Sequence, residues 1–546
     1  MSTLEINRSE DVRGWIEAVL FFALALATRL PHLDHPGFYD EYYHTLAARS
    51  LLETGSFHSE VISYGRAASF SQMVAVSFRL FGEGLAAARV PALLSGCALV
   101  VATWALGRRV GGVWAGRFAA LFLCFDPDAI YFSQLARFYT THALVVLAAG
   151  AMLFIATSRE SGRSPAWRIA ALAASSALFL FASHLNLLTA FAVLAFLAAS
   201  AVDLAPSAAR LWRRDRRFRR LAPVAAILFG VIAWVNLPDP AWLVSYYLRP
   251  SQFAVERQFD FAFFLRALGN HFPVFCALMP LAVLFGLRRC PRFTVFAAVA
   301  FTVGFALHSG AGRKEERYLS WAIPLFHLII GIGAATARPH VEDLAREGIG
   351  ALQRVGAKVA VRTAPALLTA LMAFVALGFN PGFRITLGML ATPTESWPGP
   401  YHRHQPAQWE AATPLLEELL TERCVLVSSA GIKALQHLRR LDYDLLRSLR
   451  EEQARNLGPD HDVEFVLDPR TRRPIVSEVG SIEELERRHA SGVVVVDEVH
   501  WGRSSFVTRD VAAYLEDRFE RVDVPQEWRM RIYVWGEPRI DDTCVP

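Results

Sequence analysis

Two adjacent carboxylates follow the first long apolar segment of the chain. Asp40 and Glu41 lie in an aromatic-rich stretch, residues 38–44, at a position that corresponds to a membrane surface. A carboxylate there can take a proton from an attacking hydroxyl group or hold a positively charged partner. The simpler alternative is an interfacial charge beneath a belt of aromatic side chains. The sequence therefore predicts either a general base or a structural interfacial charge at the edge of a membrane.

A second acidic pair, Asp126 and Asp128, lies on either side of Pro127 in a turn between two apolar segments. One interpretation is a catalytic or acceptor-positioning role. The other is that one of the two side chains caps the following helix, as aspartate commonly does. Both interpretations stay open at this point.

Composition identifies the environment of these groups. The chain has 546 residues, of which 53% are hydrophobic and only 20% are charged, and this balance is too apolar for an ordinary soluble protein of its size. A helix needs about 20 mostly apolar residues to cross a membrane, and roughly eleven segments qualify. The candidates are residues 15–30, 85–106, 113–130, 138–157, 167–183, 187–203, 221–237, 271–287, 293–308, 318–337 and 364–379.

Arginines set the orientation, since basic short loops stay on the cytoplasmic side. With a cytoplasmic amino terminus, the arginines of residues 108–109, 159–168, 210–220 and 288–292 all fall inside. This arrangement predicts a bacterial-type inner or plasma membrane protein whose carboxyl-terminal part lies outside. It also accounts for the net charge of +5 through membrane topology and anionic lipid, so nucleic acid is not an expected partner.

The organisation along the chain predicts three parts. Residues 1–391 form the membrane domain, in which residues 42–53 and 69–81 have the apolar spacing of helices lying in the interface plane. Residues 392–406 are a proline-rich linker. Residues 407–546 alternate strand-like patterns, at residues 425–428, 493–496 and 530–535, with helical patterns, and predict a soluble α/β domain. Its Cys424 and Cys544 are either a disulfide or two thiols, since spacing alone does not decide.

The order of several short motifs resembles the GT-C superfamily of integral-membrane glycosyltransferases, in particular the clan of protein O-mannosyltransferases and lipid A aminoarabinose transferases. The resemblance covers residues 14 to about 335 and depends on motifs at fixed positions. They are Asp40-Glu41-Tyr42-Tyr43, residues 47–55, Leu80-Phe81-Gly82, residues 88–94, residues 131–139, and Glu316-Arg317-Tyr318-Leu319 before Ile323-Pro324.

The resemblance implies a GT-C fold and transfer of one sugar, with inversion, from a polyprenyl-phosphate carrier to an acceptor on the outer side of the membrane. It places Asp40 in the catalytic loop as the general base, with Glu41 as its neighbour, and it leaves open which of the two acts. It also implies an acidic residue in the turn that holds Asp126 and Asp128.

The implied leaving group is a lipid phosphate, which fixed cations stabilise in a poorly hydrated site. Arg137, Lys314 and Arg317 are the candidates, and the alternative for each arginine is that it only extends to the lipid headgroups. Aromatic and polar side chains near these positions suit a sugar pocket, although interfacial packing explains each one too. The candidate pocket residues are Tyr43, His44, Tyr64, Arg66, Tyr139, His184, Asn186, Arg313, Glu316 and Tyr318.

No cofactor is expected. Carboxylates such as Asp40, Glu41 and Asp126 can hold a divalent cation, but the arginines already supply positive charge for the phosphate, so we favour a metal-free reaction. The expected partners are the lipid-linked donor, membrane lipids, and a glycan, lipid or protein acceptor that the sequence does not distinguish. A rival hypothesis is a transporter or flippase of a lipid-linked intermediate, but transporters place charges near the middle of the membrane, whereas here they lie at the outer ends of the spans.

Overall fold

The structure is a computed structural model, and its helices and strands fall into two compact units. The first unit consists of residues 1–33, 92–134 and 138–393, and the second of residues 34–91, 135–137 and 394–546. The structure describes residues 8–35, 37–59, 62–157, 164–214, 220, 259–354, 364–392, 407–446, 466–468 and 470–538.

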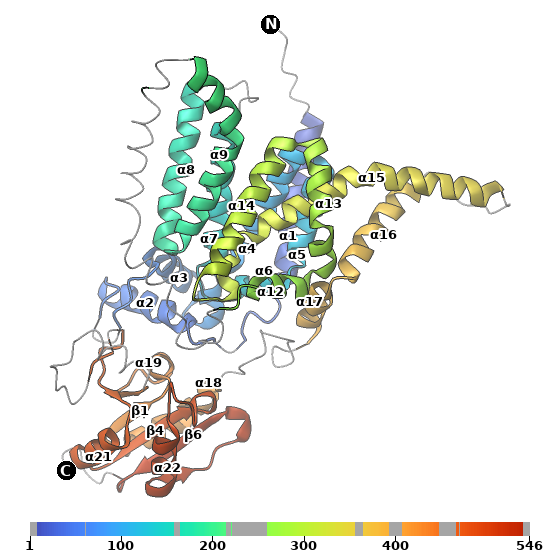
Figure 1. Cartoon of the computed structure of the whole chain (residues 1–546). Helices are drawn as coiled ribbons and strands as arrows, with labels where there is room; N and C mark the ends of the chain where they lie inside the picture. The colour runs from blue at the N-terminus through green and yellow to red at the C-terminus, as the bar shows by residue number, and fades with distance from the viewer. Residues whose placement is uncertain are drawn as a thin grey trace. The chain divides into compact units, whose positions relative to one another are not determined.

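The first unit is helical, and its long apolar helices pack against one another in pairs such as α7 with α8, α9 with α14, and α5 with α15 (Figure 1). Its elements are α1 (Arg8–Arg29), α4 (Leu85–Gly111), α5 (Val113–Cys124), α6 (Pro127–Ser133), α7 (Tyr139–Thr157), α8 (Pro165–Leu185), α9 (Thr189–Arg214), α12 (Phe263–His271), α13 (Pro273–Arg289), α14 (Pro291–Gly310), the 3-10 helix η3 (Glu316–Leu319), α15 (Ile323–Arg354), α16 (Ala364–Gly378) and α17 (Pro381–Ala391).

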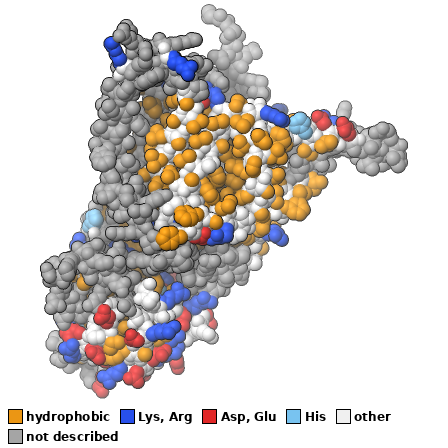
Figure 2. Space-filling view, viewed as in Figure 1, with side chains coloured by type: hydrophobic (Ala, Val, Ile, Leu, Met, Phe, Trp, Pro, Cys, Tyr) orange, Lys and Arg blue, Asp and Glu red, His pale blue; other side chains and the backbone are white. Residues whose placement is uncertain are grey.

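These helices have the apolar surface of membrane segments. Among the described residues, four helices are long and apolar enough to cross a membrane, or up to six if each bent pair counts as one span. The visible face of the bundle is covered by hydrophobic side chains, with Lys and Arg toward its margins (Figure 2). The predicted count of about eleven spans stays a prediction. The predicted span at residues 221–237 lies outside the described residues.

Close packing in the first unit requires small residues where helices meet. A Cβ atom added to Gly116 of α5 would lie 2.5 Å from the backbone oxygen of Trp104 on α4, a distance that no side chain tolerates. Glycine therefore allows the backbones of α4 and α5 to approach, as small residues do between membrane helices.

The second unit contains the helices predicted for the first outer loop. They are α2 (Glu41–Thr54) and α3 (Ala68–Phe81), in agreement with the predicted residues 42–53 and 69–81. Helix α2 ends at Gly55, whose φ of 75° is left-handed and whose N–H donates to the carbonyl of Leu51. At the other end of the helix, Asp40 is the N-cap and Glu41 is the first helical residue.

A six-stranded sheet completes the second unit. The strand order is β3-β2-β1-β4-β6-β5, in which β1 runs parallel to β2 and β4, and β6 runs antiparallel to β4 and β5. Its strands are β1 (Val425–Ser428), β2 (Tyr443–Leu445), β3 (Ile475–Val476), β4 (Gly492–Asp497), β5 (Glu520–Val522) and β6 (Met530–Trp535). Strand-like patterns at residues 425–428, 493–496 and 530–535 predicted β1, β4 and β6.

Alternate residues of these strands face two separate cores. Val493 and Val495 of β4 pack with α18 (Trp409–Thr421) and α19 (Gly431–Leu438), while Val494 and Val496 pack with α21 (Val479–Arg488) and α22 (Arg509–Arg518). The result is a layer of helices on each face of the sheet (Figure 1). The compact unit also takes in residues 34–91 and 135–137, and the predicted boundaries at residues 392 and 407 stay a prediction.

Candidate active site

Glu41 is the buried member of the first acidic pair. Its side chain is fully buried, and its two oxygens accept hydrogen bonds from Arg89 Nε at 2.8 Å and Arg89 Nη2 at 2.9 Å. The backbone N–H groups of Phe38, at 2.7 Å, and Ala136, at 2.6 Å, complete the set. Burial alone would raise the pKa of Glu41, but the Arg89 guanidinium lowers it below the usual value. Glu41 is therefore an ionised carboxylate that holds Ala136 and its neighbours.

Asp40 is the more accessible member of the same pair. It stands at the N-cap of α2 but makes no side-chain capping bond, and its side chain is 27% exposed. Arg137 donates to the backbone oxygen of Asp40 at 3.0 Å, and its Nη2 lies 3.7 Å from Oδ2 of the same residue. A partly exposed carboxylate beside a buried guanidinium can accept a proton while the cation binds an anion.

Aromatic side chains of α2 and the following loop surround this pair. The rings of Tyr43 and Tyr64 stack with centroids 4.9 Å apart, and Tyr64 Oη accepts from Arg137 Nη1 at 3.5 Å. His44 meets the Tyr64 ring edge-on and lies 2.9 Å from the Ser71 hydroxyl through Nδ1. Burial, with smaller contributions from Arg137 and from the predicted pocket residue Arg66, holds the pKa of His44 well below its usual value, so this ring is neutral.

The second acidic pair, in the first unit, divides in a similar way. Asp126 is fully buried at the N-cap of α6, where Oδ1 accepts from the N–H of Ala129 at 2.9 Å and Oδ2 lies 2.8 Å from His327 Nε2. The capping alternative that the sequence left open is thus what Asp126 does. Asp128 is 14% exposed and lies 3.2 Å from His271 Nδ1.

A cavity in the first unit brings several predicted residues together. Asp128, Tyr139 and Glu316 line it, with apolar side chains from α4, α7, α12 and α15. Arg317 lies over the ring of Tyr139, with 5.8 Å between Cζ and the ring centroid. Thr140 and Ser320 also line this small cavity of about 30 Å³, so its polar groups can make hydrogen bonds to a group that enters it.

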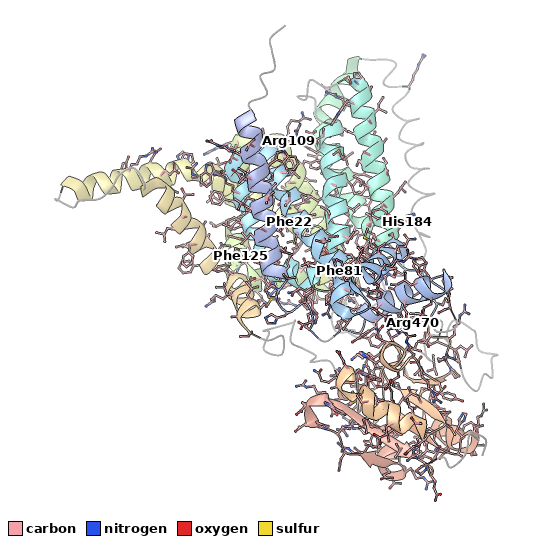
Figure 3. All side chains as sticks on the ribbon, turned by 180° about the vertical axis from the view of Figure 1, so that it is seen from behind. Phe22, Phe81, Arg109, Phe125, His184 and Arg470 are labelled. Carbon is pink, nitrogen blue, oxygen red and sulfur yellow. The ribbon has the colours of Figure 1, made fainter. Side chains whose placement is uncertain are left out.

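The other predicted residues of the first unit lie near the 3-10 helix η3 and at the end of α8. Lys314 is buried and donates to the carbonyl of Ala311 at 2.5 Å, and Tyr318 packs beside a small apolar cluster that includes Phe191. Arg313 lies just before Lys314 in the sequence. His184 is exposed in the last turn of α8 (Figure 3), whereas Asn186 is buried and accepts the N–H of Leu188 at 3.1 Å, which closes the turn.

Sequence reasoning missed several partners. Arg89 belongs to a recognised motif but was not assigned a role, although a charge at the edge of an apolar segment is a signal for one. His271 and His327 carried the same signal, since each lies in or beside an apolar segment. Among the described residues no group of three or more His, Cys, Asp or Glu side chains is placed to hold a metal ion. The possible pairing of Cys424 with Cys544 involves a residue outside the described part of the chain.

Comparison with solved structures places the fold. The chain is similar to ArnT from Cupriavidus metallidurans bound to undecaprenyl phosphate, with a TM-score of 0.63, 18% identity, and coverage of 95% of this chain and 98% of that one. The same protein in the apo state gives a TM-score of 0.61 at 18% identity, over 96% of this chain and 98% of that one.

A third structure extends the likeness. The archaeal oligosaccharyltransferase AglB from Archaeoglobus fulgidus, solved with an inhibitory peptide and a dolichol-phosphate, gives a TM-score of 0.55 at 13% identity, over 90% of this chain and 70% of that one. No family model and no curated protein matches the sequence. The likeness to ArnT and AglB confirms the predicted GT-C fold, while the roles of individual residues stay predictions.

Proposed function

We propose that this protein is a membrane glycosyltransferase that moves one sugar from a polyprenyl-phosphate carrier to an acceptor on the outer side of the membrane. The observation that carries the proposal is the arrangement of Asp40 beside Arg137, a partly exposed carboxylate against a buried guanidinium. The likeness to two proteins solved with a polyprenyl or dolichol phosphate supports a lipid-linked donor.

In the proposed reaction the acceptor hydroxyl attacks the anomeric carbon and gives its proton to Asp40. A new bond forms between the acceptor oxygen and the sugar, the bond from the sugar to the phosphate breaks, and the polyprenyl phosphate leaves with the electron pair. Attack from the face opposite the phosphate inverts the anomeric centre. General base catalysis of this kind contributes typically 10²–10⁴-fold in rate.

The geometry gives the two neighbouring carboxylates different roles in this proposal. Asp40 is the base because its carboxylate is partly exposed, whereas both oxygens of Glu41 already accept hydrogen bonds from Arg89 and from backbone N–H groups. Glu41 acts through the segment that it holds, since Ala136 precedes Arg137. We assign Arg137 to the donor phosphate, whose oxygens a guanidinium binds in a bidentate manner.

Residues of the first unit receive separate roles. Arg317 and Lys314 are proposed to bind a phosphate group. Asp128 and Glu316, which line the cavity together with Tyr139, are proposed to contact the sugar or the acceptor. No role in the reaction is proposed for Asp126 or Asn186, because both side chains fix local turns. No metal is included in the reaction.

The experiment that tests the proposal separates transfer from transport. The full chain is reconstituted in proteoliposomes with a panel of polyprenyl-phosphate sugars and candidate glycan, lipid and peptide acceptors. The proposal predicts release of polyprenyl phosphate together with a glycosylated acceptor. If a donor crosses to the other leaflet with its sugar-phosphate bond intact, and no acceptor is modified, the rival transporter function is correct.

A further inference from the structure

A groove of about 970 Å³ in the second unit has no role in the proposed reaction. It lies where β4 ends and β6 begins, next to the 3-10 helices η6 (Glu498–His500) and η7 (Gln526–Trp528). Ligands of open α/β sheets bind outside the carboxyl ends of the parallel strands, and the end of β4 is such a position. The lining is mostly polar and includes two acidic residues, Glu498 and Glu527, and four arginines, Arg503, Arg521, Arg529 and Arg531.

The arginines of this groove differ in how their charge is balanced. Arg531 binds both oxygens of Glu498, at 2.9 and 3.0 Å, and also contacts Glu516 at 3.0 Å. Arg503, Arg521 and Arg529 make no ion pair with any residue that the structure describes. Four arginines face two acidic residues in the lining, so the groove carries a net positive charge.

One of these arginines, Arg529, has an unusual backbone conformation. Arg529 has a φ of 50°, in the left-handed region that residues other than glycine seldom occupy. Its carbonyl accepts from the N–H of Glu498 at 2.9 Å, which joins the start of β6 to the end of β4. Such a conformation is retained where surrounding contacts impose it, often at functional sites.

We propose that this groove binds the carboxylate or phosphate groups of an anionic glycan. A guanidinium offers a planar pair of donors that matches either group, and three arginines suit a ligand with repeated charges. The volume falls within the range of small-molecule sites and exceeds what a single anion needs, and the polar lining excludes a mainly apolar ligand. That the ligand is a glycan depends on the proposed function, whereas its negative charge does not.

Binding to the full chain in detergent tests this site without any assay of transfer. The probes are an oligogalacturonate, a phosphorylated oligosaccharide and a neutral malto-oligosaccharide of equal length. We expect binding of at least one anionic probe and not of the neutral one. The double variant Arg521→Gln and Arg529→Gln should weaken that binding at least tenfold and flatten its dependence on salt.

A matched control removes the same charge from outside the groove. Arg509→Gln combined with Arg518→Gln changes exposed residues of α22 that do not line the groove. The inference is overturned if neither anionic probe binds, or if this control weakens binding as much as the groove variant does. Whichever anionic probe binds more tightly identifies carboxylate or phosphate as the preferred group.

A second, independent observation concerns Arg470, which joins the sheet region to helix α2 (Figure 3). Asp468 fixes the guanidinium with two contacts of 3.1 Å, and Arg470 donates to Tyr43 Oη while its Cζ lies 5.3 Å from the centre of that ring. The carbonyl of Arg470 also accepts from the N–H of Ser63 at 2.8 Å, next to Tyr64.

These contacts continue to the proposed base within the same unit. Tyr43 stacks on Tyr64, the Tyr64 hydroxyl contacts Arg137, and Arg137 binds the backbone oxygen of Asp40. We infer that Arg470 is a positioning residue for Arg137 and Asp40, an inference that depends on the proposed function. The region around the sheet then contributes to catalysis, because it sets the geometry of the catalytic loop.

Steady-state kinetics of Arg470→Gln test this role. We expect kcat to fall 10- to 100-fold with little change in the KM for the donor, and Arg470→Lys to recover part of the loss. Tyr43→Phe, which keeps the ring but removes the hydroxyl, should lower kcat as well, and the double variant should lose less than the product of the two. Arg472→Gln, an exposed neighbour, is the control and should match the wild type.

The outcomes separate this inference from the proposed function. If the wild-type protein shows no transfer, the proposed function fails. If the wild type transfers sugar and Arg470→Gln keeps its kcat, or if the losses in Arg470→Gln and Tyr43→Phe simply multiply, the positioning role of Arg470 is wrong. If the melting temperature shows that Arg470→Gln does not fold, the kcat values of Tyr43→Phe and Arg470→Lys test the positioning role instead.

Discussion

The two acidic pairs, one in each compact unit, show the same division between a buried and a more accessible carboxylate. In the pair Asp40 and Glu41, Glu41 is fully buried and Asp40 is 27% exposed. In the pair Asp126 and Asp128, Asp126 is fully buried and Asp128 is 14% exposed. Proximity in sequence therefore does not give two carboxylates the same role.

The two buried carboxylates differ in the groups that neutralise their charge. Glu41 is paired with a bidentate arginine, whose charge does not change at any pH that a protein survives. Asp126 has a helix N-terminus and His327 instead. Each buried carboxylate holds backbone in place, so its accessible neighbour is presented by a rigid support.

The largest effect is expected from removing the charge of Glu41. Glu41→Gln leaves Arg89 buried without its counter-charge, which typically costs 3–5 kcal/mol of stability. The double variant Glu41→Gln and Arg89→Met removes both charges and should recover much of that loss. Thermal unfolding of the full chain measures both changes, and a single variant as stable as the wild type would show that Glu41 is not the holding member of its pair.

A smaller effect is expected from the cations assigned to the lipid phosphate. Arg137→Gln and Arg317→Ala each remove one charge-assisted contact, worth about 1.5–3 kcal/mol, or roughly 10- to 150-fold in affinity for the donor. Equilibrium binding of polyprenyl phosphate to each variant checks this, with Arg472→Gln as an exposed control. If the affinity of one variant is unchanged, that arginine does not bind the phosphate.

The second acidic pair should separate stability from activity. Asp126→Ala removes the cap of α6, worth about 0.5–2 kcal/mol of stability, and also the contact to His327, so the loss should exceed that of the cap alone. Asp128→Asn leaves the cap intact and should instead reduce transfer, because Asp128 lines the cavity. Melting temperatures and transfer rates of both variants measure the division, and a stability loss for Asp128→Asn equal to that of Asp126→Ala would contradict it.

The smallest effect is a predicted absence of pH dependence. The pKa of Glu41 is lowered in the folded protein, so its stabilising contribution is fully present above the unfolded value of about 4.3 and is lost only as the pH falls through the folded value. The difference in melting temperature between the wild type and Glu41→Gln should therefore stay constant between pH 5 and 8. A difference that shrinks as the pH falls toward 5 would mean that Glu41 is partly protonated there, whereas loss of the charge of His35, which also lowers the pKa of Glu41, would shrink it as the pH rises.

The sequence predicted the elements well and the pairings poorly. The helices α2 and α3 and the strands β1, β4 and β6 follow from local apolar patterns, which are visible in a single chain. The GT-C fold was predicted from a resemblance in the order of short motifs. Four of the predicted site residues, Asp40, Arg137, Tyr43 and Tyr64, lie in one cluster, and their roles stay predictions.

The missing information concerns partners that are distant in sequence. Arg89 is 48 residues from Glu41, and Arg470 is 427 residues from Tyr43. No local pattern encodes such contacts, because they arise when elements fold together. The division between Asp40 and Glu41 has the same origin, since consecutive residues at a helix start point in different directions and only the packed structure decides which one is buried.

We propose that Asp40, and not Glu41, takes the proton from the acceptor. The most direct measurement is the single-turnover rate of transfer by Asp40→Asn, with saturating donor, beside the melting temperature and donor affinity of the same protein. We predict a rate lower by a factor of about 10²–10⁴, with donor affinity and melting temperature close to those of the wild type. A rate equal to that of the wild type would contradict the account.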